Sequence, residues 1–191
     1  MTYEELLLDE VCKWDIQKLN LIYTNPIIFV CGGSLEKELD ETDQKYSFES
    51  LRQYFIDHAF AHNSSLNLRT AEELKDYLKI YNDLLEFESD IANVCDLILI
   101  ILESSGSLTE LGVFIGNEEF SKKLVVIRNR SHSQEDSFIN LGPLLVLKNL
   151  KDNSVLDYDW PYDKKFKTLQ NETLKLICED ISDHLKSSTT Q

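Results

Sequence analysis

The sequence predicts an α/β protein with a doubly wound parallel sheet of about four or five strands and flanking helices. Two short apolar runs occur at residues 26–31 and 96–102, and the first of them stops at Gly32-Gly33-Ser34, as a buried strand does. Segments with helical periodicity lie between and after these runs, and internal repeats are absent from the sequence. Alternating strands and helices are typical of a parallel sheet with helices on both faces.

Four strands are expected. Residues 26–31 are apolar and rich in β-branched side chains, and residues 96–102 form the most hydrophobic run of the chain. Residues 123–127 and 144–147 read as two further strands. In such a sheet the ligand site lies at the carboxyl ends of the strands.

Helices are expected between the strands. Apolar spacing predicts helices over residues 47–62, 70–95 with a possible break near Ser89, 107–120 and 164–186, and loops over 36–45, 63–69 and 128–137.

The chain length of 191 residues allows one substantial core. We expect a helical extension over residues 1–24, one α/β domain over 25–187, and a polar tail over 188–191. The amino-terminal residues are acidic and lack the features of a secretory signal, and no run of eighteen apolar residues occurs. The sequence therefore predicts a cytoplasmic protein.

A formal net charge of −15 disfavours direct binding of nucleic acid, although backbone N–H groups could still hold a small anion. The four cysteines are widely spaced, so neither a disulfide framework nor a structural metal is expected. His58 and His62 would share a helix face, but no third metal ligand accompanies them. We expect no metal and no cofactor.

Three of the six glycines, Gly32, Gly33 and Gly106, lie just after the two strongest predicted strands. At such positions the backbone either approaches a ligand closely or takes a positive φ angle. The alternative is an ordinary tight turn between strand and helix. The N–H groups of Ser105, Gly106 and Ser107 could hold hydroxyl or phosphate groups of a ligand.

Glu110 is the candidate catalytic carboxylate. With Ser107 as helix cap, Glu110 would occupy the third helical position, but residues 2–5 and 70–73 have the same spacing. What distinguishes Glu110 is its place after a buried strand, facing the crevice of the sheet. A helix N-terminus stabilises a carboxylate by about 0.3–1 kcal/mol, which would keep Glu110 ionised and suited to act as a nucleophile.

The segment 90–96, the strand after it and the run Glu-Ser-Ser-Gly-Ser-Leu-Thr-Glu-Leu-Gly-Val-Phe over residues 103–114 resemble the nucleoside 2-deoxyribosyltransferase-like superfamily. Within it, Cys-Gly-Gly-Ser at residues 31–34 together with this run is similar to the N-glycosidase toxin effectors of bacterial retrons, which act in anti-phage defence. The resemblance covers roughly residues 25–130. It implies a flavodoxin-like (Rossmann-like) sheet and cleavage of a nucleotide or nucleoside N-glycosidic bond by Glu110, with NAD as the leading substrate.

The resemblance also implies a binding site at the two Gly-Ser loops, made of Cys31, Gly32, Gly33, Ser34, Ser104, Ser105, Gly106 and Ser107. In the transferases the residue six before the nucleophile is usually Asp, whereas this chain has Ser104, so hydrolysis is favoured over deoxyribosyl exchange. A retron reverse transcriptase with its RNA–DNA product would be a restraining partner, and a homo-oligomer is expected.

Other residues and functions stay open. Arg52 could bind an anionic or carbonyl group, or could be a solvated helix residue. One of Glu86, Glu88 and Asp90 could be a second carboxylate, or all three could form a solvated acidic face. A nucleoside 2-deoxyribosyltransferase, a non-catalytic nucleotide sensor and an interaction subunit are the alternative functions.

Overall fold

The computed structural model describes residues 25–42, 44–73, 80–161 and 165–188. The expected helical extension over residues 1–24 and nearly all of the expected polar tail lie outside the described residues. No helix in the described ranges is long and apolar enough to cross a membrane.

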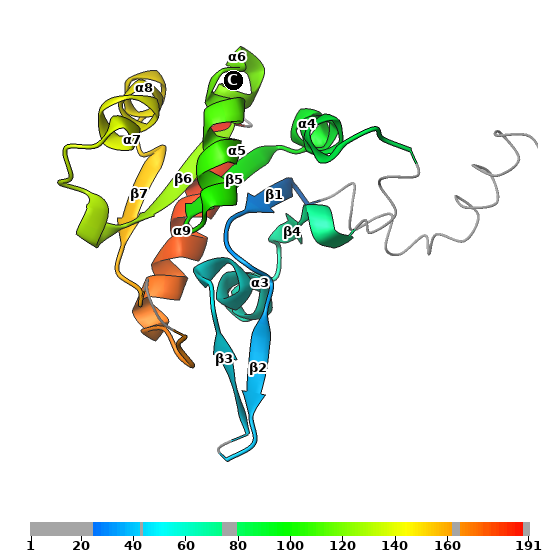
Figure 1. Ribbon diagram of the computed structural model, residues 1–191, viewed down its shortest axis with the longest axis vertical. Coiled ribbons are helices and arrows are strands. Elements are labelled where there is room, and N and C mark those ends of the chain that lie inside the picture. The colour runs from blue at the N-terminus through cyan, green and yellow to red at the C-terminus, as the bar shows by residue number, and fades with distance from the viewer. Residues whose placement is uncertain (1–24, 43, 74–79, 162–164, 189–191) are drawn as a thin grey trace, which may run out of the picture.

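The central sheet has five parallel strands in the order β4-β1-β5-β6-β7 (Figure 1). Counted along the sheet's own strands this order is 2-1-3-4-5, the flavodoxin-like order of a doubly wound sheet, and the predicted fold class is confirmed. The strands are β1 (Ile27–Cys31), β4 (Asn67–Arg69), β5 (Leu97–Leu102), β6 (Leu124–Asn129) and β7 (Val155–Tyr158).

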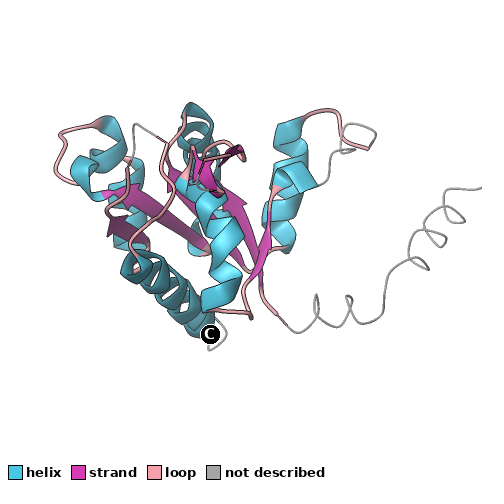
Figure 2. Ribbon diagram, turned by 90° about the horizontal axis from the view of Figure 1, so that it is seen from below, coloured by secondary structure: helices cyan, strands magenta, loops and turns pink. Residues whose placement is uncertain are grey.

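Helices cover both faces of the sheet (Figure 2). Helices α3 (Leu51–His62) and α9 (Asn171–Ser188) pack on one face. The other face is covered by α4 (Leu84–Val94), α5 (Ser105–Ile115) and α8 (Pro143–Leu150). Shorter helices complete the connections, namely η1 (Ala71–Glu73), α6 (Glu118–Lys122), η3 (Arg130–His132) and α7 (Phe138–Leu141).

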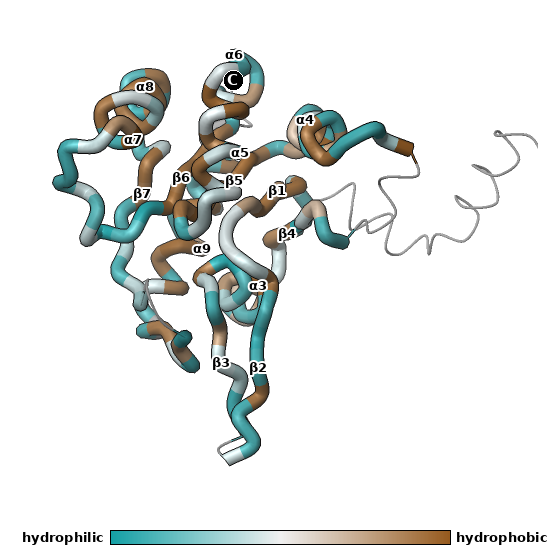
Figure 3. The backbone as a smooth tube through the Cα atoms, in the orientation of Figure 1, coloured by the Kyte–Doolittle hydropathy of each residue, from teal (hydrophilic) through white to brown (hydrophobic). Residues whose placement is uncertain are grey.

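Alternate residues of each central strand enter opposite cores. Ile28 and Val30 of β1 join the core beneath α3 and α9, whereas Phe29 and Cys31 join the core beneath α5. Every residue of β5 is buried, because helices cover both sides of this strand. Burial on both faces explains the unbroken apolar runs, which colour these strands as hydrophobic in Figure 3.

The predicted loop over residues 36–45 is wrong, because most of it forms an antiparallel hairpin of β2 (Lys37–Asp40) and β3 (Lys45–Phe48). The hairpin extends away from the sheet and is largely hydrophilic (Figures 1 and 3). Its exposed side chains give no apolar alternation, so the sequence pattern concealed it. The predicted helix over 47–62 consequently starts later, at Leu51, where the side chain of Ser50 accepts a hydrogen bond from the Gln53 N–H as the cap.

The strand predicted over residues 144–147 is also wrong, because these residues belong to α8. Pro143 occupies the first turn of the helix, a position that proline favours. Leu144 and Leu147 are buried three residues apart, while Leu145 and Val146 are exposed, which is helical spacing. A run of only four apolar residues does not distinguish a buried strand from a helix.

Two edge strands were not predicted. β4 falls inside the expected loop 63–69, and β7 falls between the expected strand 144–147 and the last helix. Both strands are short and only partly buried, so neither carries the apolar run of a central strand.

The remaining boundaries shift. Of the predicted helix 70–95, the described part comprises η1 and α4, and residues 74–79 lie outside the described ranges. The predicted helix 107–120 is two helices, α5 and α6, and it begins two residues earlier. The last helix begins at Asn171 rather than at residue 164.

Candidate active site

The candidate site lies where β1 and β5 end side by side in the sheet. The chain connects β1 forward to β4 on one side and β5 onward to β6 on the other, so the strand order reverses between β1 and β5. Open α/β sheets bind ligands in the crevice at such a reversal. The loop after β1 and the loop after β5 contact each other, since Ser104 Oγ donates to the Gly32 carbonyl over 3.0 Å.

Glu103, the first residue after β5, holds this edge together. Its Oε1 accepts from the N–H groups of Gly33 (3.1 Å) and Arg52 (2.9 Å), and its Oε2 accepts from Leu51 N–H (2.7 Å). Leu51 and Arg52 are the first two residues of α3, whose amides have no partner within the helix. Burial raises the pKa of Glu103, and the three amides oppose the rise. Glu103 therefore fixes α3 to the sheet.

Arg52 is buried, with 5% of its surface exposed, so the interpretation as a solvated helix residue is wrong. Its guanidinium donates to the carbonyls of Val30 (3.1 Å) and Gly33 (3.2 Å) and makes a bidentate ion pair with Glu72 (2.8 and 2.7 Å). Four of the five guanidinium N–H groups are thereby engaged. Burial would raise the pKa of Glu72, but the hydrogen bonds and charge of Arg52 outweigh it and lower the pKa.

Ser104, not Ser107, caps the helix that carries Glu110. Ser104 Oγ accepts from Ser107 N–H (3.1 Å), and the Ser107 hydroxyl in turn accepts from Ser104 N–H (3.1 Å). The capping box is therefore formed by Ser104 and Ser107, three residues earlier than the predicted box of Ser107 and Glu110. Ser107 is completely buried. Glu110 then occupies the sixth helical position, beyond the first turn.

The local environment of Glu110 differs from the predicted one. Burial raises the pKa of the Glu110 carboxyl; the charge of Arg52 opposes this rise and the charge of Glu72 adds to it. The helix N-terminus acts within the first turn, so it does not hold this pKa down as predicted. The Oε2 atom of Glu110 is buried and has no hydrogen-bond partner among the described residues. A buried oxygen without a partner is rare in a folded protein and suits an atom that awaits a ligand.

The structure separates the three acidic residues of α4. Glu86 and Asp90 are exposed, and Glu86 accepts a hydrogen bond from Asn82 near the start of the helix. Glu88 is partly buried, and its pKa is raised to about 7, by burial first and then by the charge of Glu110 and that of Glu72, while Arg52 opposes the rise. Glu88 is therefore the one of the three acidic residues that is partly buried, and a solvated acidic face describes the other two.

The other predicted site residues lie at the same edge of the sheet with different exposures. Ser34, Ser105 and Gly106 are exposed, and Gly106 has open space where a side chain would stand, apart from Ser104 Oγ at 3.6 Å. Cys31 is buried in the core, and burial, together with the charges of Glu110 and Glu88, raises its pKa well above that of a free thiol.

The glycines do not use the positive φ angles that were one of the two expectations, since every described glycine has a negative φ. Gly33 is instead a packing requirement. A Cβ at this position would lie 2.7 Å from Cβ of Ser50 and 3.0 Å from the side chain of Glu103. At Gly32 a Cβ would lie 3.0 Å from Cβ of Arg52. These two glycines admit the side chains that join α3 to the sheet.

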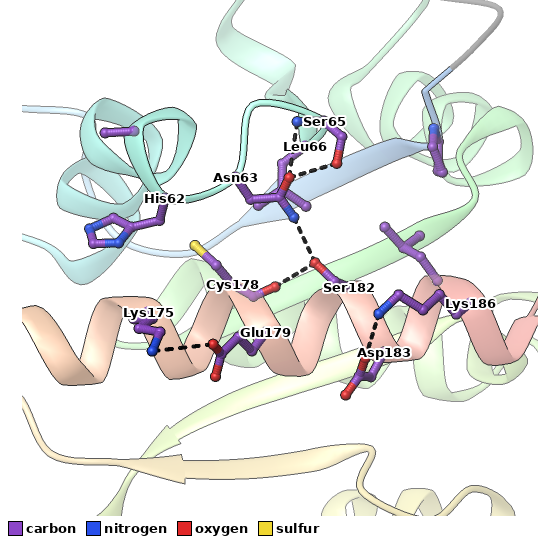
Figure 4. A pocket seen from close by; sticks show the side chains of 13 residues that line it. His62, Asn63, Ser65, Leu66, Lys175, Cys178, Glu179, Ser182, Asp183 and Lys186 are labelled. Carbon is purple, nitrogen blue, oxygen red and sulfur yellow. Dashed lines mark hydrogen bonds and ion pairs between the residues drawn. The ribbon is translucent and has the colours of Figure 1, made fainter.

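Two surface hollows lie at the opposite edge of the sheet. One is lined by residues of α3 and α9 and by Pro26, which precedes β1 (Figure 4). The other includes Asp96, Lys123 and Asn153, which precede β5, β6 and β7. His62 lines the first hollow. The described ranges contain no group of three or more His, Cys, Asp or Glu residues placed to hold a metal ion. Neither hollow contains a residue of the carboxyl edge.

Residues 49–191 match the model of the STM3845 retron effector protein family. The chain belongs to this family. The match begins after the loop that follows β1 and includes Arg52, Glu72, Glu88, Glu103 and Glu110.

Two curated relatives of this retron effector come from Escherichia coli. The protein named "Retron Ec86 putative ribosyltransferase/DNA-binding protein" is 33% identical over 132 residues, which cover 68% of this chain and 39% of the relative. The protein named "Retron Ec73 putative ribosyltransferase/DNA-binding protein" is 29% identical over 120 residues, which cover 61% of this chain and 36% of the relative. The chain spans about two fifths of the length of these relatives.

Sequence reasoning missed the parts played by Glu72 and Glu103. The position of Glu103 directly after the most hydrophobic strand was a usable signal, because the crevice of such a sheet begins there. The ion pair of Glu72 with Arg52 joins residues that are 20 positions apart and belong to different elements, so sequence spacing does not predict it.

Proposed function

We propose that this retron effector cleaves the N-glycosidic bond of a nucleotide or nucleoside, with Glu110 as nucleophile and NAD as the first substrate to test. The observation that carries the proposal is the buried Oε2 of Glu110, which lacks a partner in the described part of the chain at the edge where this fold binds ligands. The resemblance to the nucleoside 2-deoxyribosyltransferase-like superfamily and the ribosyltransferase names of the relatives support it.

The chemistry follows from the position of the carboxylate. An oxygen of Glu110 attacks the anomeric carbon of the sugar while the bond from that carbon to the base nitrogen breaks, and the nitrogen keeps the electron pair. The transition state resembles an oxocarbenium ion, which a neighbouring carboxylate stabilises. Water then attacks the anomeric carbon of the glycosyl-enzyme, the bond from that carbon to Glu110 breaks, and the water gives up a proton, which the departed base takes up or, when the base is nicotinamide, the solvent takes up.

The first turn of α5 supplies the binding groups in this proposal. Ser105 and Gly106 are exposed there, and amide groups at a helix N-terminus bind phosphate or hydroxyl oxygens. The hydroxyl of Ser104 is already bonded to Gly32 and Ser107, so it does not replace an orienting aspartate. The cap role of Ser104 therefore favours hydrolysis over deoxyribosyl exchange.

The proposed restraining partner is the retron reverse transcriptase with its RNA–DNA product. The relatives carry a DNA-binding function in their names, but this chain spans only about two fifths of them and has a formal net charge of −15. Such a negative charge repels the phosphate groups of a nucleic-acid backbone. We therefore propose that nucleic acid reaches this chain through a partner and not through its own surface.

Replacing Glu110 with Gln tests the proposed function. We expect at least a roughly thousandfold loss of base or nicotinamide release, because Gln cannot act as the nucleophile, with the thermal unfolding temperature retained. The measurement is mass spectrometry of products after incubation with NAD and a panel of nucleosides and nucleotides. Glu118→Gln, an exposed residue of α6, is the matched control.

Full activity of the Glu110→Gln variant would show that the mechanism is wrong. Tight binding of a nucleotide to the wild-type protein, without product after long incubation, would instead favour a nucleotide sensor.

A further inference from the structure

Helix α5, which the structure describes throughout, exposes no charged side chain. After its first turn the outer side of this helix consists of Leu108, Thr109, Gly112 and Val113, and Gly116 follows at its carboxyl end. Charged residues make up 28% of the sequence, and the outer side of a surface helix usually carries them. An outer side without charge is typical of a surface that another protein covers.

The neighbouring helices α7 and α8 extend this uncharged surface. Helix α5 contacts α8, α7 packs on α8, and all three lie on the same side of the sheet (Figure 1). Phe138 of α7 is 83% exposed. The other exposed apolar side chains of these two fully described helices are Leu141, Leu145, Val146 and Leu150, and Lys148 is the exposed charged one. Together with the outer side of α5, these apolar residues form the apolar face.

The apolar face has the size of the central part of a dimer interface. Its exposed area is on the order of several hundred Å², and the largest apolar patch of an ordinary monomer covers about 300–600 Å². A stable interface covers about 800 Å² on each partner, and a polar rim supplies part of that area. The apolar face is therefore large enough for stable association.

The charge of the chain favours a second copy as the molecule that covers the apolar face. With a formal net charge of −15, two copies repel each other wherever their acidic surfaces meet. Contact through the apolar face avoids this repulsion, because the acidic residues Glu86 and Asp90 are exposed on α4, beyond the edge of the face. A basic partner would instead be attracted to such acidic surfaces.

The outer side of α5 is also complementary to itself. Leu108, Gly112 and Gly116 are spaced by four residues and therefore form one row along the helix. A Cβ at Gly112 would meet no atom of the described chain within 4 Å, and a Cβ at Gly116 would meet only carbonyl oxygens, the nearer at 3.5 Å. The glycines are thus gaps in the row. In an antiparallel pair of α5 helices related by a two-fold axis at Gly112, Leu108 of each copy lies opposite Gly116 of the other.

We propose that the apolar face is the interface of a two-fold symmetric dimer of this chain, in which α5 packs antiparallel on α5 of the second copy around Gly112. The same rotation places α8 against α8 of the second copy, so that the exposed leucines of α8 are covered as well. This inference does not depend on the proposed chemistry.

Sedimentation velocity over a series of protein concentrations tests the dimer. The wild-type protein should sediment with the mass of two chains. Val113→Glu should raise the dissociation constant of the dimer at least about 100-fold, because it places an unpaired carboxylate in the interface. Gly112→Leu should raise it at least about tenfold, because the new side chain fills the gap between the two helices. The circular dichroism of both variants should stay that of the wild type, since both positions face solvent within one chain.

Phe60→Glu is the matched control. Phe60 is 69% exposed on α3, which packs on the other face of the sheet, so this variant adds the same charge and should retain the wild-type dissociation constant. Added NaCl should strengthen the dimer, because salt screens the repulsion between two acidic chains. A wild-type protein that stays monomeric at every concentration would overturn the proposal, as would a dimer that salt weakens or that Phe60→Glu disrupts as strongly as Val113→Glu. A wild-type dissociation constant in Gly112→Leu would overturn the pairing of α5 with α5.

Discussion

Glu103 and Glu110 are seven residues apart in the sequence, yet their carboxyl groups have different surroundings. Glu103 accepts three backbone N–H groups from the loop after β1 and from the start of α3. Glu110 has an oxygen that is buried and without a partner in the described residues. Burial raises the pKa of both. The satisfied carboxylate stabilises the fold, and the unsatisfied one remains available for chemistry.

The replacement Glu103→Gln tests the structural role. Gln has a single acceptor oxygen, so an NH₂ group would face at least one buried backbone N–H, and the free energy of unfolding should fall by about 1–3 kcal/mol. Urea unfolding of this variant beside Glu118→Gln would measure the loss. Stability equal to that of the wild type would mean that Glu103 is not the residue that fixes α3.

At the scale of single elements, α5 and α3 begin at the same edge for different reasons. Helix α5 is capped by Ser104, whose side chain and backbone N–H form a capping box with Ser107. Helix α3 begins at Leu51, and the N–H groups of its first two residues donate to the carboxylate of Glu103. Close packing therefore constrains the loop after β1, whereas the first turn of α5 at Gly106 is open.

The variants Gly33→Ala and Gly106→Ala test packing and ligand binding separately. At Gly33 the new methyl group meets Ser50 and Glu103, so we expect a loss of about 1–3 kcal/mol in the free energy of unfolding. At Gly106 Ala should stabilise the helix by about 0.5–1 kcal/mol but lower kcat/KM, because its methyl group enters the proposed binding space. Thermal unfolding and product release measure the two effects. A Gly106→Ala variant with unchanged kcat/KM would place the ligand elsewhere.

At the scale of the whole molecule, the two edges of the sheet carry different features. The carboxyl edge holds Arg52 and Glu110, while the two surface hollows lie at the amino edge. Lys151 in one hollow has a buried Nζ without a hydrogen-bond partner in the described ranges, and burial lowers its pKa. Burial of this ammonium group lowers the stability of the fold. Lys151 also lies at the edge of the sheet opposite to the proposed chemistry.

The replacement Lys151→Met should therefore raise the free energy of unfolding by about 1 kcal/mol, because it removes an unsatisfied buried cation. Product release should stay at the wild-type rate. Chemical unfolding and the NAD and nucleotide assays check both statements, with Lys148→Met on the exposed face of α8 as control. A loss of activity in Lys151→Met would contradict the separation of the two edges.

The sequence by itself determined the central part of the fold. β1, β5 and the first four residues of β6 are apolar because helices bury both faces of these strands, and this gives a signal that needs no tertiary information. The edge strands β4 and β7, the β2–β3 hairpin and helix α8 lack such a signal, since one side of each faces solvent.

For the candidate site, the sequence predicted that the two loops and Glu110 lie together, because residues that follow central parallel strands gather at one edge of the sheet. Only the tertiary structure decided what each side chain does there. It buried Arg52 against Glu72, engaged Glu103 with three amides, moved the helix cap to Ser104, and partly buried Glu88 while leaving Glu86 and Asp90 exposed. These assignments depend on burial and on contacts between elements distant in sequence, which local spacing does not encode.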